Sequence, residues 1–482
     1  EGRELSPSSL IERLQRLDEG LQIEPMPAFD LEETAPAAVF HLLGGEMRKA
    51  TAEAPLSPLW QDIYGFFDEN SQWQKHLSLL KQGIGKTAKP ERLSPKTAKA
   101  LYGKNIFSSV SRLERFAGCP FSFFAEYGLK AEERRLYQLN TPDLGSLFHE
   151  VLELFSNKLE QDSLPWTTLT KEETTARIHA AVEDAAPRLG NRILLDSAAN
   201  QYLIRRLKRI STRAAWTLVQ HLQQGDFIPA GYEVGFGTHE ALPPIVIRLQ
   251  DGGSLILNGK IDRVDLLDAN GTRYVKIIDY KSGNKTFHFQ DIYYGLQLQL
   301  LVYLDAYLKY YKKTGASFKP GGVFYFRITD PTLALDEELS AEAIEKILYE
   351  KMRMSGLLLQ EDVLIHGLDH SLSESRSSAI VPVGYTKKGD PTAASNLATE
   401  EQYAAILDFV ATRTQEIGDA MKAGIITPAP YRDGQRTPCA YCSYRSLCRH
   451  SYGEAPRWRK LKKIDKADFW ETITPKQPPE TE

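Results

Sequence analysis

The sequence predicts an α+β protein in which a mixed central sheet is flanked by helices. Three observations lead to this prediction. Helical periodicity dominates the chain up to about residue 225. Strand-like segments separated by Gly- and Asn-containing turns follow between residues 231 and 281. A helical segment at about 291–311 and one further strand, residues 321–328, come next, so strands and helices are segregated as in α+β folds.

The chain is expected to divide into three parts. Residues 1–100 are predicted to be helical and contain no chemical motif. Residues 101–450 hold all the chemical motifs and are expected to form the main domain, with helical insertions. Residues 451–482 are basic and then Pro-rich, which predicts a disordered tail. Because the chain begins at Glu1 without a methionine, we expect a fragment or a processed chain.

Composition excludes few classes of protein. Hydrophobic residues make up 42% and charged residues 25% of the chain, which is typical of soluble proteins. The sequence has no apolar run of membrane-spanning length and no signal-peptide pattern, so we expect a cytoplasmic protein without membrane contact. The 59 basic and 63 acidic side chains give a net charge of −4. This charge leaves nucleic-acid binding open, because basic residues can gather locally.

The first candidate functional residue is a histidine on a predicted helix. Thr141 can cap this helix, and His149 lies on one face between Gly145, one turn before it, and Glu153, one turn after it. A glycine at this position allows another segment or a ligand to approach closely. The alternative is a helix-face histidine paired with Glu153.

Two aspartates lie in a predicted hairpin. Asp262 and Asp279 each follow an apolar, β-branched stretch, and pairing of the two strands can place them side by side. Carboxylates brought together in a half-buried sheet repel each other unless a cation lies between them. Oxygen ligands favour Mg²⁺ or Mn²⁺, and a histidine nitrogen somewhat favours Mn²⁺. Asp265, three residues after Asp262, is predicted to point to the other face and to lie at the surface.

Further polar residues flank this hairpin. Asp279 and Lys281 are two residues apart and share a strand face, and Gln299 and Tyr303 are four apart and share a helix face. Separately, these pairs could be a strand-end ion pair and a buried polar pair. Glu233, on the first predicted strand, is a weak signal and is left out of the predicted metal site.

Phosphodiester hydrolysis needs such a set of groups. A metal held by carboxylates polarises a phosphate and lowers the pKa of its bound water, and a nearby lysine stabilises developing negative charge. The order of the motifs along the chain is more specific than any motif alone. The predicted metal ligands are His149, Asp262 and Asp279, and the predicted catalytic residues are Asp262, Asp279, Lys281, Gln299 and Tyr303.

The chain has four cysteines, of which Cys439, Cys442 and Cys448 are close together and Cys119 lies far upstream. Their scarcity and clustering indicate metal-binding thiols in a reducing compartment rather than a disulfide framework. Zinc sites usually show two close pairs, whereas a lone cysteine plus a trio fits a [4Fe–4S] cluster at least as well. Spacing leaves iron–sulfur and zinc both open, and four unrelated thiols are the third alternative. If the four meet, the bound metal acts as a structural staple.

Two basic stretches are candidate DNA contacts, although a solvated charged face is the favoured interpretation of each. The first is the polar face of a helix, with Arg205, Arg206, Arg209 and Arg213. The second is the segment that contains Arg457, Arg459 and Lys460.

Taken in order, these motifs resemble the RecB-type branch of the PD-(D/E)xK nuclease superfamily. The cysteine arrangement resembles the iron–sulfur subset of that branch. The stretch "SPKTAKALYG…SVSRLERFAGCPFSFFAEYGL…TPDLGSLFHEVLE" resembles the AddB family, whose members pair with AddA in bacterial AddAB helicase–nucleases. The resemblance covers about residues 94–450.

The resemblance implies a PD-(D/E)xK nuclease core with an iron–sulfur staple. His149, Asp262 and Asp279 would bind Mg²⁺, Lys281 would be the catalytic lysine, and the four cysteines would hold [4Fe–4S]. The implied activity is that of an exonuclease that trims the 5′-ended strand at double-strand breaks for recombinational repair, as a heterodimer with an AddA-like helicase–nuclease.

Two other functions remain open. One is an iron–sulfur DNA-end-binding module whose nuclease site is silent, and the other is a different iron–sulfur exonuclease of the same branch. Residues 1–93 are expected to be a remnant of the family's helicase-like region, so the sequence carries no claim about ATP binding.

Overall fold

The computed structural model of this 482-residue protein describes most of the chain. The described residues are 9–18, 35–50, 54–84, 92–132, 141–188, 198–333, 338–448, 450 and 458–474. They fall into two compact units, one ending at residue 84 and one beginning at residue 92.

The first unit is helical, as predicted. Its helices are α1 (Ser9–Leu17), α2 (Pro36–Lys49), α3 (Pro58–Glu69) and α4 (Gln74–Ile84). Leu43, Phe67 and Leu77 form its small core, and the ring of Phe40 lies 5.0 Å from those of Phe67 and Trp73. These aromatic contacts hold helices α2, α3 and the start of α4 together.

The predicted boundary at residue 100 lies too far along the chain. Helix α5 (Pro95–Tyr102) belongs to the second unit, because Ala98 is buried there and Leu93 N donates to Gly424 O at 2.9 Å. A side chain on Gly424 would lie 3.1 Å from Ala98 Cβ, so the packing is close.

A six-stranded mixed sheet forms the centre of the second unit, in the order β2-β5-β6-β7-β8-β9. Its strands β6 and β7 run parallel, as do β8 and β9, and the other neighbours are antiparallel. The predicted fold class is confirmed. The strands are β2 (Ile228–Phe236), β5 (Gly259–Ala269), β6 (Thr272–Lys281), β7 (Phe318–Arg327), β8 (Ser355–Leu359) and β9 (Leu397–Ala398).

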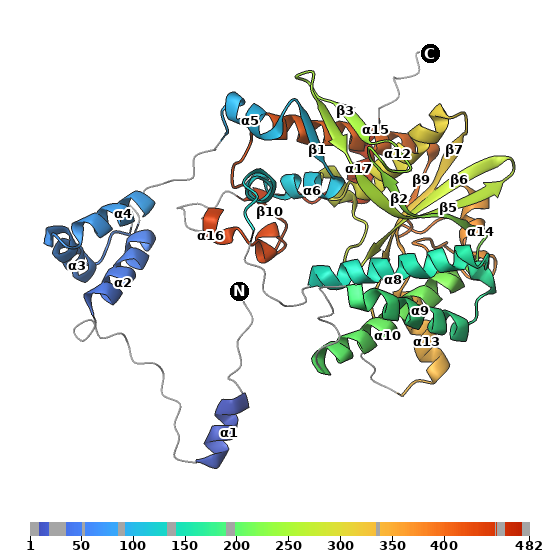
Figure 1. Ribbon diagram of the computed structural model, residues 1–482, viewed down its shortest axis with the longest axis horizontal. Helices are drawn as coiled ribbons and strands as arrows, with labels where there is room; N and C mark the ends of the chain where they lie inside the picture. The colour runs from blue at the N-terminus through green and yellow to red at the C-terminus, as the bar shows by residue number, and fades with distance from the viewer. Residues whose placement is uncertain are drawn as a thin grey trace. The chain divides into compact units, whose positions relative to one another are not determined.

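Helices cover both faces of the sheet (Figure 1). Strand β6 is buried at every position from Tyr274 to Tyr280, so neither of its faces can be left to solvent. One face is covered by α8 (Thr141–Gln161), α9 (Lys171–Ala185), α10 (Ala198–Gln223) and α13 (Ala341–Lys351), and the other by α12 (Gln299–Lys313) and α15 (Glu400–Lys422).

A second sheet of three strands has the order β1-β4-β3. These strands are β1 (Asn105–Ser108), β3 (Ile245–Arg248) and β4 (Ser254–Leu257), and α6 (Val110–Gly118) follows β1 directly. The remaining short elements are α7 (Pro120–Phe123), α14 (Asp362–Leu368), β10 (Tyr431–Arg432), α16 (Arg445–Cys448) and β11 (Arg459–Lys460).

The helix predicted at about 291–311 is interrupted. Helix α11 (Phe289–Tyr293) ends at a turn in which Gly295 has a φ of 72°, and α12 begins at Gln299. The buried Gln297 holds the turn, because its side chain accepts from His288 N at 2.9 Å and donates to Thr286 O at 2.7 Å. As a result, Gln299 lies in the first turn of α12.

The predicted disordered tail is wrong for residues 458–474. Helix α17 (Lys466–Ile473) is capped by Asp465 and buries Phe469 and Trp470. Their rings lie 5.1 and 5.4 Å from that of Phe289, so apolar burial anchors this segment. None of the helices in the described part of the chain combines the length and hydrophobicity that crossing a bilayer requires.

Candidate active site and metal centre

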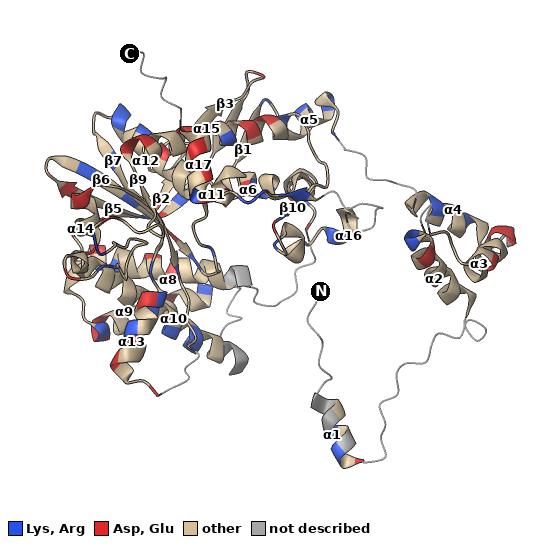
Figure 2. Cartoon of the chain, turned by 180° about the vertical axis from the view of Figure 1, so that it is seen from behind, with Lys and Arg blue, Asp and Glu red and all other residues tan. Residues whose placement is uncertain are grey.

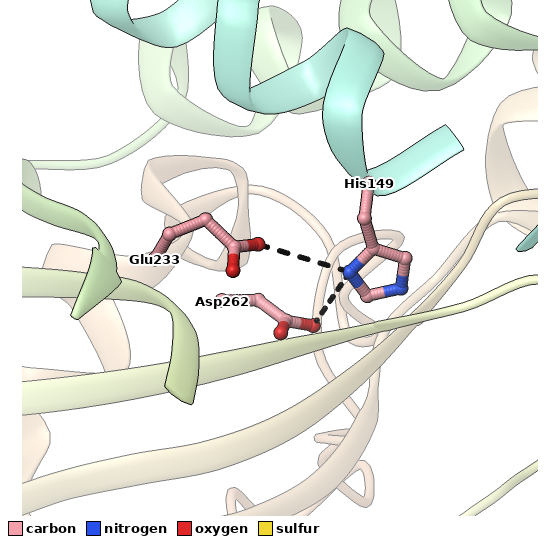
Figure 3. A group of neighbouring side chains, drawn as sticks. All are labelled: His149, Glu233 and Asp262. Atoms are coloured by element: carbon pink, nitrogen blue, oxygen red, sulfur yellow. Dashed lines mark ion pairs between the residues drawn. The ribbon is translucent and has the colours of Figure 1, made fainter. Parts of the chain in front are cut away.

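Three side chains from different elements meet at one point. His149 comes from α8, Glu233 from β2 and Asp262 from β5, and one ligand atom from each lies within 4.8 Å of the other two. Figure 3 shows the two carboxylates beside the imidazole: His149 Nδ1 lies 3.5 Å from Asp262 Oδ2 and 3.9 Å from Glu233 Oε1. This donor set of one nitrogen and carboxylate oxygens fits a hard divalent cation.

Gly145 allows α8 to approach the sheet. A Cβ built on Gly145 would lie 3.0 Å from the Oγ of Ser282, the residue that follows β6. The close approach predicted for this glycine is therefore confirmed, and it places His149, one turn further along α8, over the strand end.

Glu233 lies in the cluster, although the prediction from the sequence left it out of the metal site. Its φ of 47° is unusual for a non-glycine residue, and the β2–β5 register shifts between Pro229 and Gly231 just before it. Such strain is typical of functional sites. The only signal for this position in the sequence was a glycine inside a strand pattern. Such a glycine indicates a bulge, but it does not show which way the carboxylate after it points.

Asp262 and Asp279 lie opposite each other on neighbouring strands. The β5–β6 ladder pairs Arg263 with Ile278, which places the preceding Asp262 across from Asp279, and Asp262 Oδ2 accepts from Tyr280 N at 2.6 Å. Burial and the charge of Asp279 raise the pKa of Asp262, and burial raises the pKa of Asp279. Two adjacent buried carboxylates with raised pKa values favour a bound cation.

His149 is also affected by these carboxylates. Burial alone would lower its pKa, but the neighbouring carboxylate of Glu233 and the charges of Asp262 and Asp279 outweigh burial and raise it. A cation at this site would replace the imidazolium proton as the positive partner, since only the neutral imidazole ligates metals.

Lys281 is held between an acid and an amide. Its ammonium forms an ion pair with Asp279 and lies 3.3 Å from Gln299 Oε1, while Gln299 Nε2 donates to the Tyr303 hydroxyl at 3.3 Å. Burial would lower the pKa of Lys281, but the charges of Asp279 and Asp262 raise it, so the lysine stays protonated. The structure thus brings together all the catalytic residues predicted from the sequence.

Solvent reaches this site through a cavity of about 690 Å³. Its lining includes His149, Glu233, Glu153, Ser282 and the basic side chain of Arg188. Burial raises the pKa of Glu153, and the charge of Glu233 adds to this effect. The cavity therefore opens onto His149 and Glu233 of the three-residue cluster.

Asp265 is not a surface residue, so that prediction was wrong. Its side chain is 0% exposed and pairs with Arg263 and Lys276 at 2.6 and 2.9 Å, on the opposite face of the sheet from Asp262. The ring of Trp166 lies over the Arg263 guanidinium, 4.7 Å away. Helices cover this face too, which alternation along a single strand could not reveal.

The cysteine-bearing segments lie side by side. Cys119 is buried at the end of α6, and a Cβ on its neighbour Gly118 would lie 4.0 Å from Pro438 Cβ, next to Cys439. Cys442 Sγ lies 3.9 Å from Ser122 Oγ, close after Cys119. Burial raises the pKa of the Cys119 thiol, and nearby Cys439 adds to the rise. These contacts bring the upstream cysteine to the trio.

A compact group of three or more sulfurs, as one zinc ion would require, is not preformed among the described cysteines. Among residues that the structure describes, no three cysteine sulfurs lie within 4.8 Å of one another. Four thiolates bound to one Zn²⁺ at about 2.3 Å would lie about 3.8 Å apart.

The predicted DNA-contact residues fall into two groups. Arg205, Arg206 and Arg209 are exposed on α10. Arg209 and Arg213 both pair with Asp330, at 2.7 and 3.4 Å.

In the second group, at residues 457–460, one predicted DNA contact has a structural partner instead. The Arg459 guanidinium donates to the carbonyls of Ala429, Ala117 and Gly118, so it fastens the C-terminal segment to the residues before Cys119. Lys460 is exposed, and Arg457 lies outside the described residues.

Comparison with known proteins agrees with this geometry. A family profile of the PD-(D/E)XK nuclease superfamily matches residues 108–449, which is more than half of the chain. The chain therefore belongs to the PD-(D/E)XK nuclease superfamily. A second profile, of the ATP-dependent helicase/deoxyribonuclease AddB fifth domain, matches residues 34–83.

Relatives within the superfamily are more specific. The chain is 38% identical over 481 residues to an ATP-dependent helicase/deoxyribonuclease subunit of Alkaliphilus oremlandii, and 39% identical over 455 residues to its counterpart in Alkaliphilus metalliredigens. These matches cover 98% and 93% of this chain but 42% and 39% of the relatives. The resemblance to the AddB family is confirmed, and the chain spans about two fifths of the length of these relatives.

Proposed function

We propose that the protein is a metal-dependent deoxyribonuclease that uses Mg²⁺, with Mn²⁺ as an alternative. The observation that carries this proposal is the joint placement of His149, Glu233 and Asp262 beside the Asp279–Lys281 pair. The site fits a divalent cation, because the carboxylates of Asp262 and Asp279 are buried and have raised pKa values without one. Glu233 joins the predicted ligands His149, Asp262 and Asp279.

The residues around the cation divide the work of hydrolysis. A bound divalent metal would polarise the scissile phosphate and acidify a water molecule. Lys281 carries a positive charge toward the site and stabilises negative charge as it develops on the phosphate or the attacking water. Gln299 fixes the ammonium of Lys281, and Tyr303 fixes the amide of Gln299, so this positive charge is pre-positioned.

The names of the relatives support a wider proposal. As an AddB-like protein, the chain would pair with an AddA-like helicase–nuclease in the cytoplasm and trim the 5′-ended strand at double-strand breaks for recombinational repair. Support for a partner comes from relatives named as subunits of an ATP-dependent helicase/deoxyribonuclease. The strand polarity rests on family resemblance alone.

We further propose that the four cysteines hold a [4Fe–4S] cluster. The convergence of Cys119 with the trio supports this assignment, because a lone cysteine plus a trio fits this cluster type. The cluster would fasten the end of α6 to the C-terminal part of the second unit, so its binding energy would contribute to folding.

A basic cavity on α10 supports a single-stranded DNA path. The cavity of about 580 Å³ is lined by Arg205, Arg209 and Arg213 and by the aromatic side chains of Trp216 and Tyr349. Figure 2 marks basic residues along this helix. Cationic side chains next to aromatic rings suit phosphate contact and base stacking.

The decisive experiment measures Mg²⁺-dependent cleavage of single-stranded DNA labelled at either end. Asp279→Ala and Lys281→Ala should lower the rate about a hundredfold or more while DNA binding persists. Lys309→Ala, which breaks an exposed pair with Asp305, is the control and should cleave normally. Undiminished cleavage by Asp279→Ala refutes the proposed site, and DNA binding without cleavage in the wild type supports the silent-module alternative.

The same sample tests the cluster. Iron and acid-labile sulfide in equal amounts, together with absorbance near about 400 nm, are the expected result for this cluster type. Zinc without iron would refute the assignment.

A further inference from the structure

We infer that Glu114 is a positioning residue that ties the cysteine-bearing helix α6 to the catalytic residues on α12. This inference rests on the proposed nuclease function. Glu114 lies outside the metal cluster and outside the Lys281–Gln299–Tyr303 chain. It nevertheless contacts the segments that carry both.

Glu114 makes three polar contacts with the active-site side of the sheet. Its Oε1 accepts from Leu298 N at 2.8 Å and from Gln299 N at 3.1 Å, and its Oε2 lies 3.2 Å from Lys285 Nζ. The glutamate side chain is 12% exposed, so water does not replace these contacts freely. One carboxylate therefore holds the start of α12 and the loop after β6.

The contact with α12 fixes a catalytic side chain. The first backbone N–H groups of a helix have no partner within the helix, and a carboxylate placed there satisfies them and interacts favourably with the helix dipole. Glu114 plays this role from a separate helix, because Leu298, which precedes α12, makes no side-chain cap. Gln299, whose backbone Glu114 holds, is the residue that fixes the Lys281 ammonium.

The contact with Lys285 acts on the other side of the same site. The ammonium groups of Lys281 and Lys285 lie 5.9 and 5.3 Å from the centre of the Tyr325 ring, and Tyr325 is the β7 residue paired with Asp279. By holding Lys285, Glu114 keeps a second cation on the Tyr325 ring beside Asp279.

Helix α6 links these contacts to the cysteines. Glu114 lies within α6, and Cys119 caps its end, with Cys119 N donating to Arg115 O at 2.9 Å. A helix of this kind moves as a rigid element, so the position of Cys119 is transmitted to Glu114. Fastening the cysteines would thereby align Gln299 with Lys281.

Glu114→Ala and Glu114→Gln separate this role from general stability. Glu126→Ala is the matched control, since Glu126 pairs with Arg115, the residue next to Glu114 on α6, rather than with the start of α12. In Glu114→Ala we expect the backbone amides of Leu298 and Gln299 to exchange with solvent about tenfold faster, with kcat about tenfold lower and KM within about twofold. Glu114→Gln keeps an oxygen acceptor, so it should restore most of the amide protection and most of kcat.

Each outcome decides the inference. Normal amide exchange at Leu298 and Gln299 in Glu114→Ala overturns the inference. An equal loss of amide protection and kcat in Glu126→Ala also overturns it, because it would indicate a general weakening of the fold. Failure of Glu114→Gln to restore protection also overturns the capping role. If the wild type does not cleave DNA, the proposed function fails, while the exchange measurement still tests Glu114.

Discussion

Replacing Asp265 with alanine tests the ion cluster buried under the active-site sheet. The carboxylate is 0% exposed, and its partners Arg263 and Lys276 are 1% and 6% exposed. Two hydrogen bonds of 2.6 and 3.1 Å join it to the Arg263 guanidinium, and Lys276 Nζ lies 2.9 Å away. In Asp265→Ala, two buried cations would lose the carboxylate with which both of them pair.

The size of the effect follows from this burial. Removing one partner of a buried ion pair costs about 3–5 kcal/mol, because the remaining charge stays out of water. Because two cations are affected, we expect Asp265→Ala to lower the free energy of unfolding by an amount at the upper end of this range, about 5 kcal/mol. Burial alone would raise the pKa of Asp265, but Arg263 and Lys276 lower it. Its stabilising contribution is therefore complete above the unfolded pKa of about 3.9 and is lost as the pH falls through the folded value, so neutral pH reveals the full effect.

The chain contains a control pair with the same geometry. Arg273 donates to Asp268 through bonds of 2.6 and 3.1 Å, but these two side chains are 48% and 67% exposed. In urea unfolding followed by tryptophan fluorescence, the midpoint of Asp268→Ala should lie within error of that of the wild type. The midpoint of Asp265→Ala should shift strongly to lower urea. Equal shifts in both variants would refute the argument that burial sets the magnitude.

Three further predictions concern other parts of the second unit. Burial lowers the pKa of His221 to about 3, so between about pH 6.5 and 3 only the unfolded state binds the proton. The free energy of unfolding should therefore decrease as the pH is lowered through this range, and His221→Phe should reduce the slope by up to about 1.4 kcal/mol per pH unit. Phe469→Ala should cost about 3–5 kcal/mol in denaturant unfolding, whereas Leu447→Ala, at a side chain 60% exposed, should change little; equal effects would mean that α17 is not part of the core. Gly259→Ala should cost about 1–3 kcal/mol, because its Cβ would lie 2.6 Å from the Phe236 ring, and adding Phe236→Leu should recover part of this loss.

Local patterns predicted much of the site. Period-two alternation placed Asp279 and Lys281 on one face, and hairpin pairing placed Asp262 beside them. Helical spacing joined Gln299 to Tyr303, and their side chains are hydrogen-bonded. These relations depend on residues near each other along one element or one hairpin, where backbone geometry alone fixes the neighbours.

The errors arose where distant segments decide the outcome. Asp265 was predicted to be exposed because a strand pattern does not show which helices cover its second face, and Trp166 lies about a hundred residues upstream of it. The helix break before Gln299 depends on the side-chain hydrogen bonds of Gln297 to the preceding loop. Glu233 joins the metal cluster through a positive φ that its own residue type disfavours.

By itself, the sequence determined the class of fold, the carboxylates and the lysine of the site, and the four thiols, because each of these follows from residue type and short-range periodicity. Tertiary structure alone decided that Glu233 faces His149, that Glu114 on the cysteine-bearing helix caps α12, and that Arg459 fastens the C-terminal segment beside Cys119. The physical reason is that these contacts join segments up to 342 residues apart, and only the packing of helices on both faces of the sheet brings them together.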